Sequence, residues 1–169
     1  MKKKIFEDLS KICKTINYID DESDIIKYSK DWRGRVNEKA LCVVFPKNGD
    51  QVSEILKYCF DNEVNVIPQG GNTNLVASAS PSTEKREIII NMEKMNLIHH
   101  VDTINKCVEV DAGTVIDDLN STLEKKGFLF PLEMASTGSS QVGGIISTNA
   151  GGINVLHYGS VRNNLLALD

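Results

Sequence analysis

The sequence predicts an α/β fold in two lobes, on the strength of one pattern that occurs twice. Between residues 41 and 67 a short apolar run, an amphipathic helical segment and a second apolar run follow one another with short joints. Strand, helix and strand in this order are typical of a βαβ unit, with parallel strands and a right-handed crossover. A similar succession occupies residues 107–131, and each is followed by a glycine-rich segment.

An amphipathic helix is predicted at the start of the chain. Its apolar residues recur every three or four positions, as one face of a helix requires, and are Ile5, Phe6, Leu9, Ile12 and Ile16. A polar connection through residues 20–23 follows, and Asp31-Trp32-Arg33-Gly34-Arg35 predicts an exposed loop because of its glycine and charges. We assign residues 1–37 to the leading helix and its connection.

The first lobe is predicted over residues 38–100. Residues 41–45 form a continuous apolar run closed by proline, which is typical of a buried strand. A turn and helix N-cap at residues 48–50 introduce a helix, and residues 64–67 and 88–90 predict two further strands. The face of the helix that we expect to be buried is Val52, Ile55, Leu56, Cys59 and Phe60.

The second lobe is predicted over residues 101–169. Residues 107–110 alternate as a half-buried strand does, residues 128–131 predict another strand, and residues 165–169 the beginning of a third. Thr114 and Asp117 resemble a capping box, and Gly127 stands where a C-cap glycine belongs. The apolar face of the helix between them is Val115, Ile116, Leu119 and Leu123.

Composition and charge exclude several classes of function. The formal net charge is −4 and both signs are mixed along the chain, so no nucleic-acid partner is expected. Charged residues interrupt the stretch behind the basic start, and no apolar run is long enough to cross a membrane. No Cys-x-x-Cys pair occurs, which favours free thiols in a reducing compartment, with the cytosol as the expected location. The cysteines are Cys13, Cys42, Cys59 and Cys107.

The first glycine-rich segment, Pro68–Leu75, directly follows a predicted strand. The adjacent Gly70 and Gly71 allow successive backbone N–H groups to point into one concavity that suits phosphate oxygens. Asn72 and Thr73 add uncharged donors. Taken alone, such a loop is more often a plain Gly-Gly turn than a phosphate site.

The second glycine-rich segment runs from Ser136 to Gly152 and contains two Gly-Gly pairs joined by small and polar residues. A large flat ligand can lie against such a backbone surface. A mobile loop is the alternative, against which the apolar Ile145 and Ile146 between the pairs argue. Neither G-x-x-x-x-G-K-[ST] nor a G-x-G-x-x-G behind the first strand is present, so neither a P-loop NTPase nor an ordinary NAD-type Rossmann site is expected.

Together these segments resemble one family of flavin enzymes. Pro68–Val76 is similar to the first pyrophosphate loop of the vanillyl-alcohol oxidase (PCMH) type of FAD-binding domain. More narrowly, it resembles the branch of D-2-hydroxyglutarate, D-lactate and glycolate dehydrogenases. The resemblance also covers Pro131–Glu133, Gly138–Gly152, His157–Arg162, Asp31–Arg35 and Val43–Pro46, and so runs from about residue 30 to the last residue.

The resemblance implies a fold of two lobes with FAD stretched between them. The first-lobe loop would wrap the pyrophosphate through backbone N–H groups, and second-lobe residues would lie along the pyrophosphate and flavin. Asn74 departs from the family, whose members usually carry glycine there, although asparagine tolerates a positive φ. The implied cofactor-binding residues are Gln69, Gly70, Gly71, Asn72, Thr73, Asn74, Leu75, Pro131, Gly138, Ser139, Gly143, Gly144, Asn149, Ala150 and Gly151.

The resemblance also implies a reaction. In such enzymes the flavin takes a hydride from the hydroxyl-bearing carbon of a 2-hydroxy acid, and the catalytic groups and any metal ligands lie in a later substrate domain. We therefore assign no catalytic and no metal-binding residue here. We expect the FAD-binding part of an oxidoreductase with an incomplete second lobe. It is either a truncated product or one piece of a split enzyme whose substrate domain is a separate partner chain. The alternative is a non-catalytic remnant or small interaction protein that no longer binds flavin.

Other polar side chains give weaker signals. His99-His100 precedes a predicted strand and is expected to be a solvated pair. His157 and Arg162 lie beside the second motif, where helix-end packing and surface exposure are the plainer roles. The pairs Asp20-Asp21 and Asp117-Asp118 show no partner for acid–base chemistry.

Overall fold

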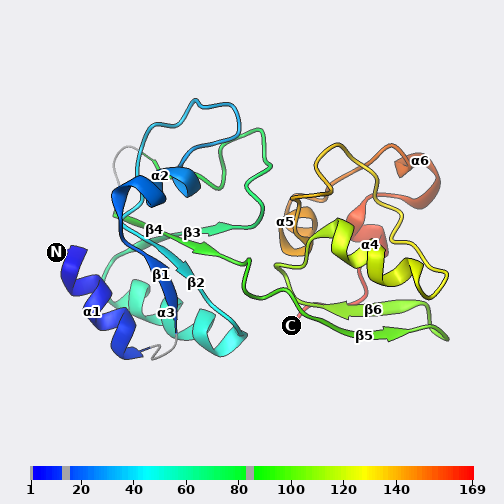
Figure 1. Cartoon of the computed structure of the whole chain (residues 1–169), viewed down its shortest axis with the longest axis horizontal. Coiled ribbons are helices and arrows are strands. Elements are labelled where there is room, and N and C mark those ends of the chain that lie inside the picture. The colour runs from blue at the N-terminus through cyan, green and yellow to red at the C-terminus, as the bar shows by residue number, and fades with distance from the viewer. Residues whose placement is uncertain (1, 13–15, 83–85) are drawn as a thin grey trace. The chain divides into compact units, whose positions relative to one another are not determined.

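The computed structural model describes residues 2–12, 16–82 and 86–169, and the chain divides into two compact units, Met1–Met95 and Asn96–Asp169 (Figure 1). The division lies after Met95 rather than near residue 100. The reason is a strand that the sequence did not predict, β5 (Ile98–Asp102), which pairs with β6 (Cys107–Val110) inside the second unit. His99 and His100 therefore belong to a strand instead of preceding one.

The first unit is built on a four-stranded sheet with the order β1-β2-β4-β3. The strands are β1 (Asn17–Ile19), β2 (Val43–Phe45), β3 (Asn65–Gln69) and β4 (Glu87–Asn91). β2, β4 and β3 run parallel, and β1 is antiparallel to β2. The three predicted strands are confirmed, but the predicted βαβ unit does not pair its own two strands, because β4 lies between them. Pro68 is accommodated because β3 is an edge strand.

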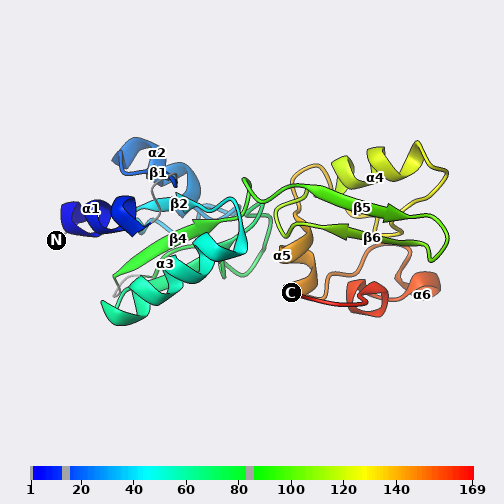
Figure 2. The same cartoon turned by 90° about the horizontal axis from the view of Figure 1, so that it is seen from below.

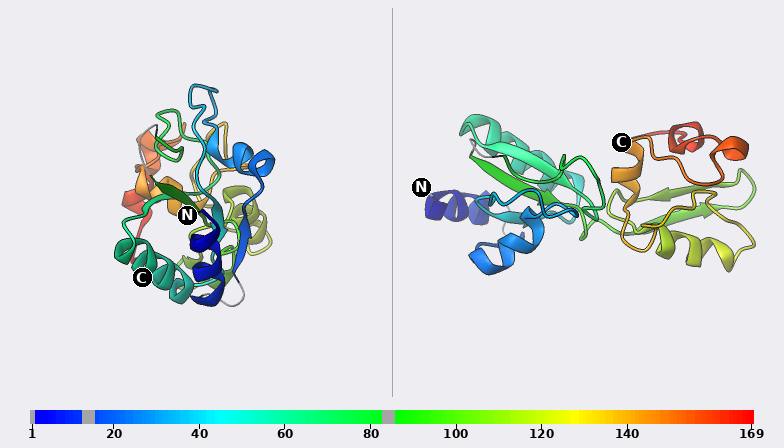
Figure 3. Two further views of the ribbon diagram at one scale, coloured as in Figure 1. Left: turned by 90° about the vertical axis from the view of Figure 1, so that its left-hand side faces the viewer. Right: turned by 90° about the horizontal axis from the view of Figure 1, so that it is seen from above.

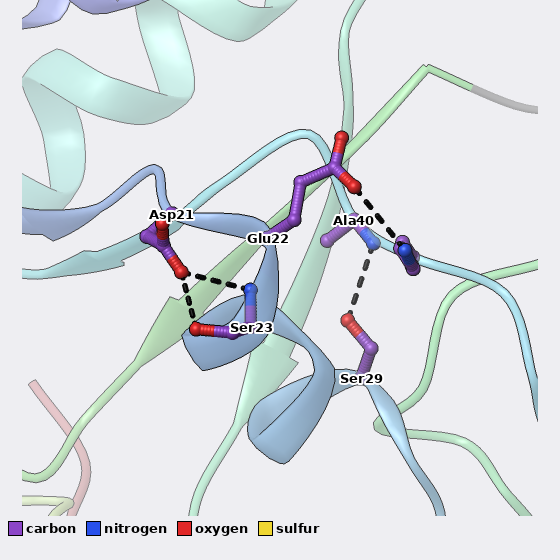
Figure 4. Close-up of polar contacts among 6 residues, drawn as sticks. Asp21, Glu22, Ser23, Ser29 and Ala40 are labelled. Atoms are coloured by element: carbon purple, nitrogen blue, oxygen red, sulfur yellow. Dashed lines mark hydrogen bonds and ion pairs between the residues drawn. The ribbon is translucent and has the colours of Figure 1, made fainter.

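The connection predicted through residues 20–23 is the start of a helix, α2 (Glu22–Ser29). Asp21 caps it: its carboxylate accepts a 2.9 Å hydrogen bond from the N–H of Ser23 and another from the Ser23 hydroxyl (Figure 4). The other end is held where the hydroxyl of Ser29, which is buried, accepts a hydrogen bond from the N–H of Ala40 at 3.2 Å. An exposed ion pair of Glu22 with Lys39, at 3.3 Å, spans the same two segments.

Helices cover both faces of this sheet, and the strand residues alternate between two apolar clusters. The predicted leading helix is α1 (Lys2–Ile12), and it packs with α3 (Gly49–Asp61) on the face that carries Val44, Ile88 and Ile90. α2 packs on the opposite face, against Val43 and Ile89. Figures 2 and 3 show α2 and α3 on opposite sides of the sheet. The resulting burial on both sides explains the continuous apolar runs of β2 and β4.

The buried face of α3 differs from the predicted one. Asn48 caps the helix as expected, with its side chain accepting from the N–H of Gln51 at 3.0 Å. Ile55, Tyr58 and Cys59 are buried, whereas Leu56 is 46% and Phe60 85% exposed. The spacing in sequence allowed either stripe, and the packing of α1 over Tyr58 selects this one.

The second unit places helices around the β5–β6 hairpin. They are α4 (Ile116–Glu124), α5 (Val142–Ser147) and α6 (Val155–Tyr158), followed by a 3₁₀ turn at Val161–Asn164. α4 and α6 lie on opposite sides of the hairpin (Figure 2). The predicted face of α4 is confirmed, since Ile116, Leu119 and Leu123 are buried. The core of this unit is formed by Ile116, Leu132, Ile145 and Val161.

Three local predictions for the second unit are corrected. The capping box does not form: the N-cap residue of α4 is Val115, and the Thr114 hydroxyl donates to the carbonyl of Leu97 at 3.3 Å. Residues 128–131 are not a strand, because the N–H of Phe130 bonds to the side chain of Asn120 at 2.9 Å. Residues 165–169 are irregular as well.

The predicted C-cap of α4 is confirmed. Gly127 has φ +77°, and the N–H of Phe128 returns to the carbonyl of Leu123 at 3.1 Å. This is a Schellman motif, which satisfies the last carbonyls of a helix and favours glycine at the left-handed position.

No disulfide joins the cysteines that the structure describes. Cys42 and Cys59 are buried and Cys107 is half-buried, while Cys13 lies outside the described residues. Burial raises the pKa of the Cys59 thiol to about 11, so it is protonated at neutral pH. Among the described residues, no helix has the length and apolarity to span a membrane.

The neighbours Ile55 and Leu56 provide a direct test of the α3 packing. Ile55→Ala should lower the free energy of unfolding by about 2–5 kcal/mol, because it empties a fully buried site. Leu56→Ala should cost under about 1 kcal/mol, because that side chain is half exposed. Urea denaturation followed by the emission of Trp32, the single tryptophan, reports on the first unit. Equal losses in both variants would show that the helix buries the wider face.

Candidate functional site

The first-unit site begins at a buried amide, the side chain of Gln69. β3 and β4 are parallel, so their carboxyl ends lie at the same edge of the sheet, where Gln69 pairs with Asn91. Gln69 is only 2% exposed. Its Nε2 donates to the carbonyls of Tyr28, at 2.7 Å, and Ala79, at 2.8 Å, and its Oε1 accepts from Asn91 Nδ2 at 3.0 Å. Gln69 therefore ties together the segments that surround the glycine loop.

The loop behind Gln69 presents backbone donors. Gly70, Gly71 and Asn72 are half-buried, and within the described part of the chain nothing accepts a hydrogen bond from their N–H groups. Asn72 has φ +52°, and its side chain is held by a 2.7 Å bond to the carbonyl of Lys30. Partly buried N–H groups take water or a ligand as their partner. Their succession along one turn suits the oxygens of an anion.

The remaining residues of the loop shape it. Asn74 is not among the described residues with a positive φ, so the left-handed backbone expected there is absent. Instead its side-chain oxygen accepts from the N–H of Ser78 at 3.0 Å, which folds the chain back towards residue 79. Thr73 is half-buried, and Leu75 is exposed.

In the second unit, Gly143 is a close-packing residue. Its N–H donates to the carbonyl of Ala112 at 2.7 Å, and a Cβ placed on it would lie 2.9 Å from the Cβ of Ala112. The preceding N–H, of Val142, is also taken, by the carbonyl of Thr114 at 2.9 Å. These two N–H groups at the start of α5 are therefore hydrogen-bonded inside the unit. The close contact with Ala112 explains why residue 143 is glycine.

Gly144 differs from its neighbour. It is exposed, and a Cβ built on it would meet no atom within 4 Å. Gly138 and Ser139, in the turn before α5, are exposed as well, and a Cβ at Gly138 would lie 3.2 Å from Asp117 Oδ2. Pro131 is half-buried. Gly138, Ser139 and Gly144 therefore offer bare backbone to a ligand at the surface of the unit.

The third predicted group, Asn149–Gly151, follows α5 directly. Asn149 has φ +51°, and its side-chain oxygen accepts from the N–H of Arg162 at 3.1 Å. The Arg162 guanidinium donates hydrogen bonds to the carbonyls of Ser147, at 3.0 Å, and Ile146, at 3.4 Å, so it caps the end of α5. Ala150 packs against the core and Gly151 is exposed.

The polar candidates outside these segments have structural explanations. His99 Nε2 lies 2.7 Å from Asp111 Oδ1, and this hydrogen bond raises the pKa of His99. The other Asp111 oxygen accepts from the N–H of Leu97 at 3.0 Å, so the pair fixes the entry into β5. His157 is exposed and stacks edge-on against Tyr158. The described residues contain no group of three or more His, Cys, Asp or Glu that could hold a metal ion.

Asn91 and Tyr28 position the first-unit loop but were not foreseen from the sequence. The available signal was a polar residue, Asn91, ending the apolar run of β4, as Gln69 ends that of β3. In parallel strands, two such residues are brought together at one edge. Tyr28 contributes only its carbonyl, for which the sequence carries no signal.

The two glycines of α5 predict opposite responses to alanine. Gly143→Ala should destabilise the second unit by about 1–3 kcal/mol, because its Cβ would overlap Ala112. Gly144→Ala should be neutral or stabilising by up to about 1 kcal/mol, because alanine is the better helix former. Amide hydrogen exchange of α4, which starts beside Ala112, measures both. Loss of protection in Gly144→Ala would contradict this assignment.

Most of the chain is similar to known proteins. The model of a family described as "FAD binding domain" matches residues 40–169. The D-2-hydroxyglutarate–pyruvate transhydrogenase of Saccharomyces cerevisiae is 37% identical over 86% of this chain and 29% of its own length. The mitochondrial D-2-hydroxyglutarate dehydrogenase of Danio rerio is 38% identical over 88% of this chain and 28% of its own. The chain thus spans less than a third of these relatives.

The fold is also found in a solved structure. A structure of an alkyldihydroxyacetonephosphate synthase superposes with a TM-score of 0.83, covering 95% of this chain and 32% of that one at 22% identity. The predicted two-lobed α/β fold is confirmed at the level of its class. FAD is the cofactor of the matching family. The chain belongs to the PCMH-type family of FAD-binding domains, with relatives named D-2-hydroxyglutarate and D-lactate dehydrogenases.

Proposed function

We propose that the chain binds the diphosphate of FAD on the loop from Gly70 to Asn72. The observation that carries this is a run of three half-buried residues whose N–H groups have no acceptor among the described residues. Gln69 and Asn74 act behind the loop, as the residues that fix its shape. Successive backbone N–H donors suit the oxygens and the charge of a diphosphate.

The second unit contributes bare backbone in the same proposal. Gly138, Ser139, Gly144 and Gly151 are exposed and carry small or no side chains, so a planar ring system can lie against them. Gly143, Asn149 and Ala150 hold this surface in place through their packing and hydrogen bonds. Taken unit by unit, the residues present fit FAD: the first unit offers backbone donors, and the second unit offers open backbone.

We further propose that the whole protein oxidises a D-2-hydroxy acid to the 2-oxo acid. The names of the relatives support this, since they are D-2-hydroxyglutarate and D-lactate enzymes that share 37–39% identity with the chain. FAD supplies the hydride acceptor when bound. The residues of this chain bind and orient the cofactor, and the groups that hold the hydroxy acid lie outside this chain.

A second proposal is that the chain serves in recognition without catalysis. Large apolar side chains on the second unit favour it: Leu156 is 100%, Leu166 82% and Ile153 73% exposed. Such side chains suit contact with another polypeptide.

The cytosolic location expected from the cysteines stays a prediction, and the Danio rerio relative is named as mitochondrial.

Flavin content tests the FAD site, and substrate-dependent bleaching tests the reaction. The purified chain should take up one FAD, and Gly144→Val should weaken the affinity roughly tenfold or more by covering the open backbone. In the protein as isolated from its own cells, D-2-hydroxyglutarate or D-lactate should bleach the oxidised flavin under anaerobic conditions, and the L enantiomers serve as controls. A folded chain that takes up no FAD contradicts the site. Flavin that no D-2-hydroxy acid bleaches contradicts the reaction.

A further inference from the structure

The loop after α2 is locked around a buried carboxylate. Asp31 is 5% exposed and accepts hydrogen bonds from the N–H groups of Arg35, at 2.6 Å, Val36, at 2.9 Å, and Arg33, at 3.3 Å. These bonds, that of Val36 foremost, hold the pKa of the Asp31 carboxyl below its ordinary value. Gly34 completes the turn with φ +66°. A segment predicted as an exposed loop is thus ordered through one buried residue.

This ordered loop is joined to the glycine loop within the same unit. Asn72 bonds to the carbonyl of Lys30, directly before Asp31, at 2.7 Å. Gln69 bonds to the carbonyl of Tyr28 at 2.7 Å. Figure 1 shows the two loops, blue and green, extending from the same end of the sheet. Two side chains of the glycine loop therefore hold the backbone that leads into the Asp31 turn.

The side chains that the turn exposes are an aromatic ring and two cations. Trp32 is 72% exposed, and Arg33 and Arg35 are exposed beside it. Among the described residues, no ion pair or hydrogen bond joins either guanidinium to another side chain. Asp31, the acid nearest to Arg33 in sequence, already accepts hydrogen bonds from backbone N–H groups.

The glycine loop needs a cation that it does not contain. Residues 68–82 include no lysine, arginine or histidine. A diphosphate that leaves water for neutral N–H donors alone keeps an uncompensated charge, which is costly in a partly buried site. Guanidinium groups bind phosphate oxygens through paired donors and remain charged at every physiological pH.

We propose that the Asp31 turn is the cationic wall of the diphosphate site, with Arg33 and Arg35 binding phosphate oxygens and Trp32 beside them. This inference rests on the proposed function of the glycine loop and adds residues outside it. The buried Asp31 holds the turn, and Asn72 couples its position to the donors of Gly70–Asn72. The ligand class is a diphosphate, free or within a nucleotide.

Trp32 makes the test local, because it is the only tryptophan of the chain. Inorganic pyrophosphate and ADP are titrated into the 169-residue chain while Trp32 emission is recorded with excitation at the red edge of indole absorption. Neither ligand accepts energy from indole, so a change in emission reports contact near the turn. FAD and riboflavin are then titrated by flavin fluorescence, because riboflavin lacks the diphosphate.

The variant is Arg33→Gln/Arg35→Gln, and its matched control is Lys11→Gln/Lys57→Gln. The control removes the same two charges from exposed positions of α1 and α3, on the other face of the sheet. The arginine variant should bind pyrophosphate, ADP and FAD roughly tenfold or more weakly, since charge-assisted hydrogen bonds are lost. Riboflavin affinity should not change, and the control should bind all four ligands as the unaltered chain does.

The outcomes separate this inference from the proposed function. If FAD binds and the arginine variant binds it equally well, the cationic wall is wrong and the glycine loop stands. If FAD does not bind but pyrophosphate or ADP shifts Trp32 emission in an arginine-dependent way, the wall stands and the flavin site fails. If none of the three phosphate ligands binds the folded chain, both are overturned.

Discussion

A buried side-chain amide at the carboxyl edge of a parallel sheet determines the shape of the first-unit site. An amide in an apolar setting is tolerated only when its donors and acceptor are satisfied, and Gln69 satisfies all three with Tyr28, Ala79 and Asn91. Those partners come from the end of α2, the loop beyond the glycines and the neighbouring strand. Gln69 therefore holds the segments that border Gly70 and Gly71, and the glycine loop is positioned by its attachment to the sheet.

Glycine has two separate uses in this chain. Gly143 and Gly152 are places where backbone meets backbone: a Cβ on Gly152 would lie 2.3 Å from the carbonyl oxygen of Glu133, and one on Gly143 3.1 Å from that of Ala112. Gly144 has no neighbour to avoid. A glycine-rich stretch in the sequence thus combines structural positions with open ones. Only the open positions are free to face a ligand, which narrows the second-unit part of the proposed site.

The strands of the first unit and the glycine loops could be predicted from the sequence because their signals are local. Apolar runs closed by polar or proline residues mark β2, β3 and β4, and Gly127 marks the end of α4. Strand order was not accessible, since β4 reaches its place between β2 and β3 through pairing that no short window records. β1 has only three residues, too few for a clear pattern. α2 begins in a polar run, and its start depends on the hydrogen bond between Asp21 and Ser23.

The resemblance implied a set of cofactor-binding residues, and the structure shows how their side chains are held. The resemblance picked out Gln69 and Asn74 together with the glycines, and the structure gives both side chains to the interior framework of the loop. The turn at Asp31 was expected to be merely exposed, whereas three hydrogen bonds to one buried carboxylate order it. Such bonds join residues by backbone geometry, which residue types alone do not reveal.

The central claim is that the N–H groups of Gly70, Gly71 and Asn72 receive the diphosphate of FAD. At 18.7 kDa the chain is within reach of backbone-resolved NMR. Titration with FAD, followed by amide proton and nitrogen shifts, tests the claim most directly. We expect these three amide protons to move downfield together at one equivalent, as amide protons do on bonding to an anion. Binding that leaves all three unshifted while other amides respond would contradict it.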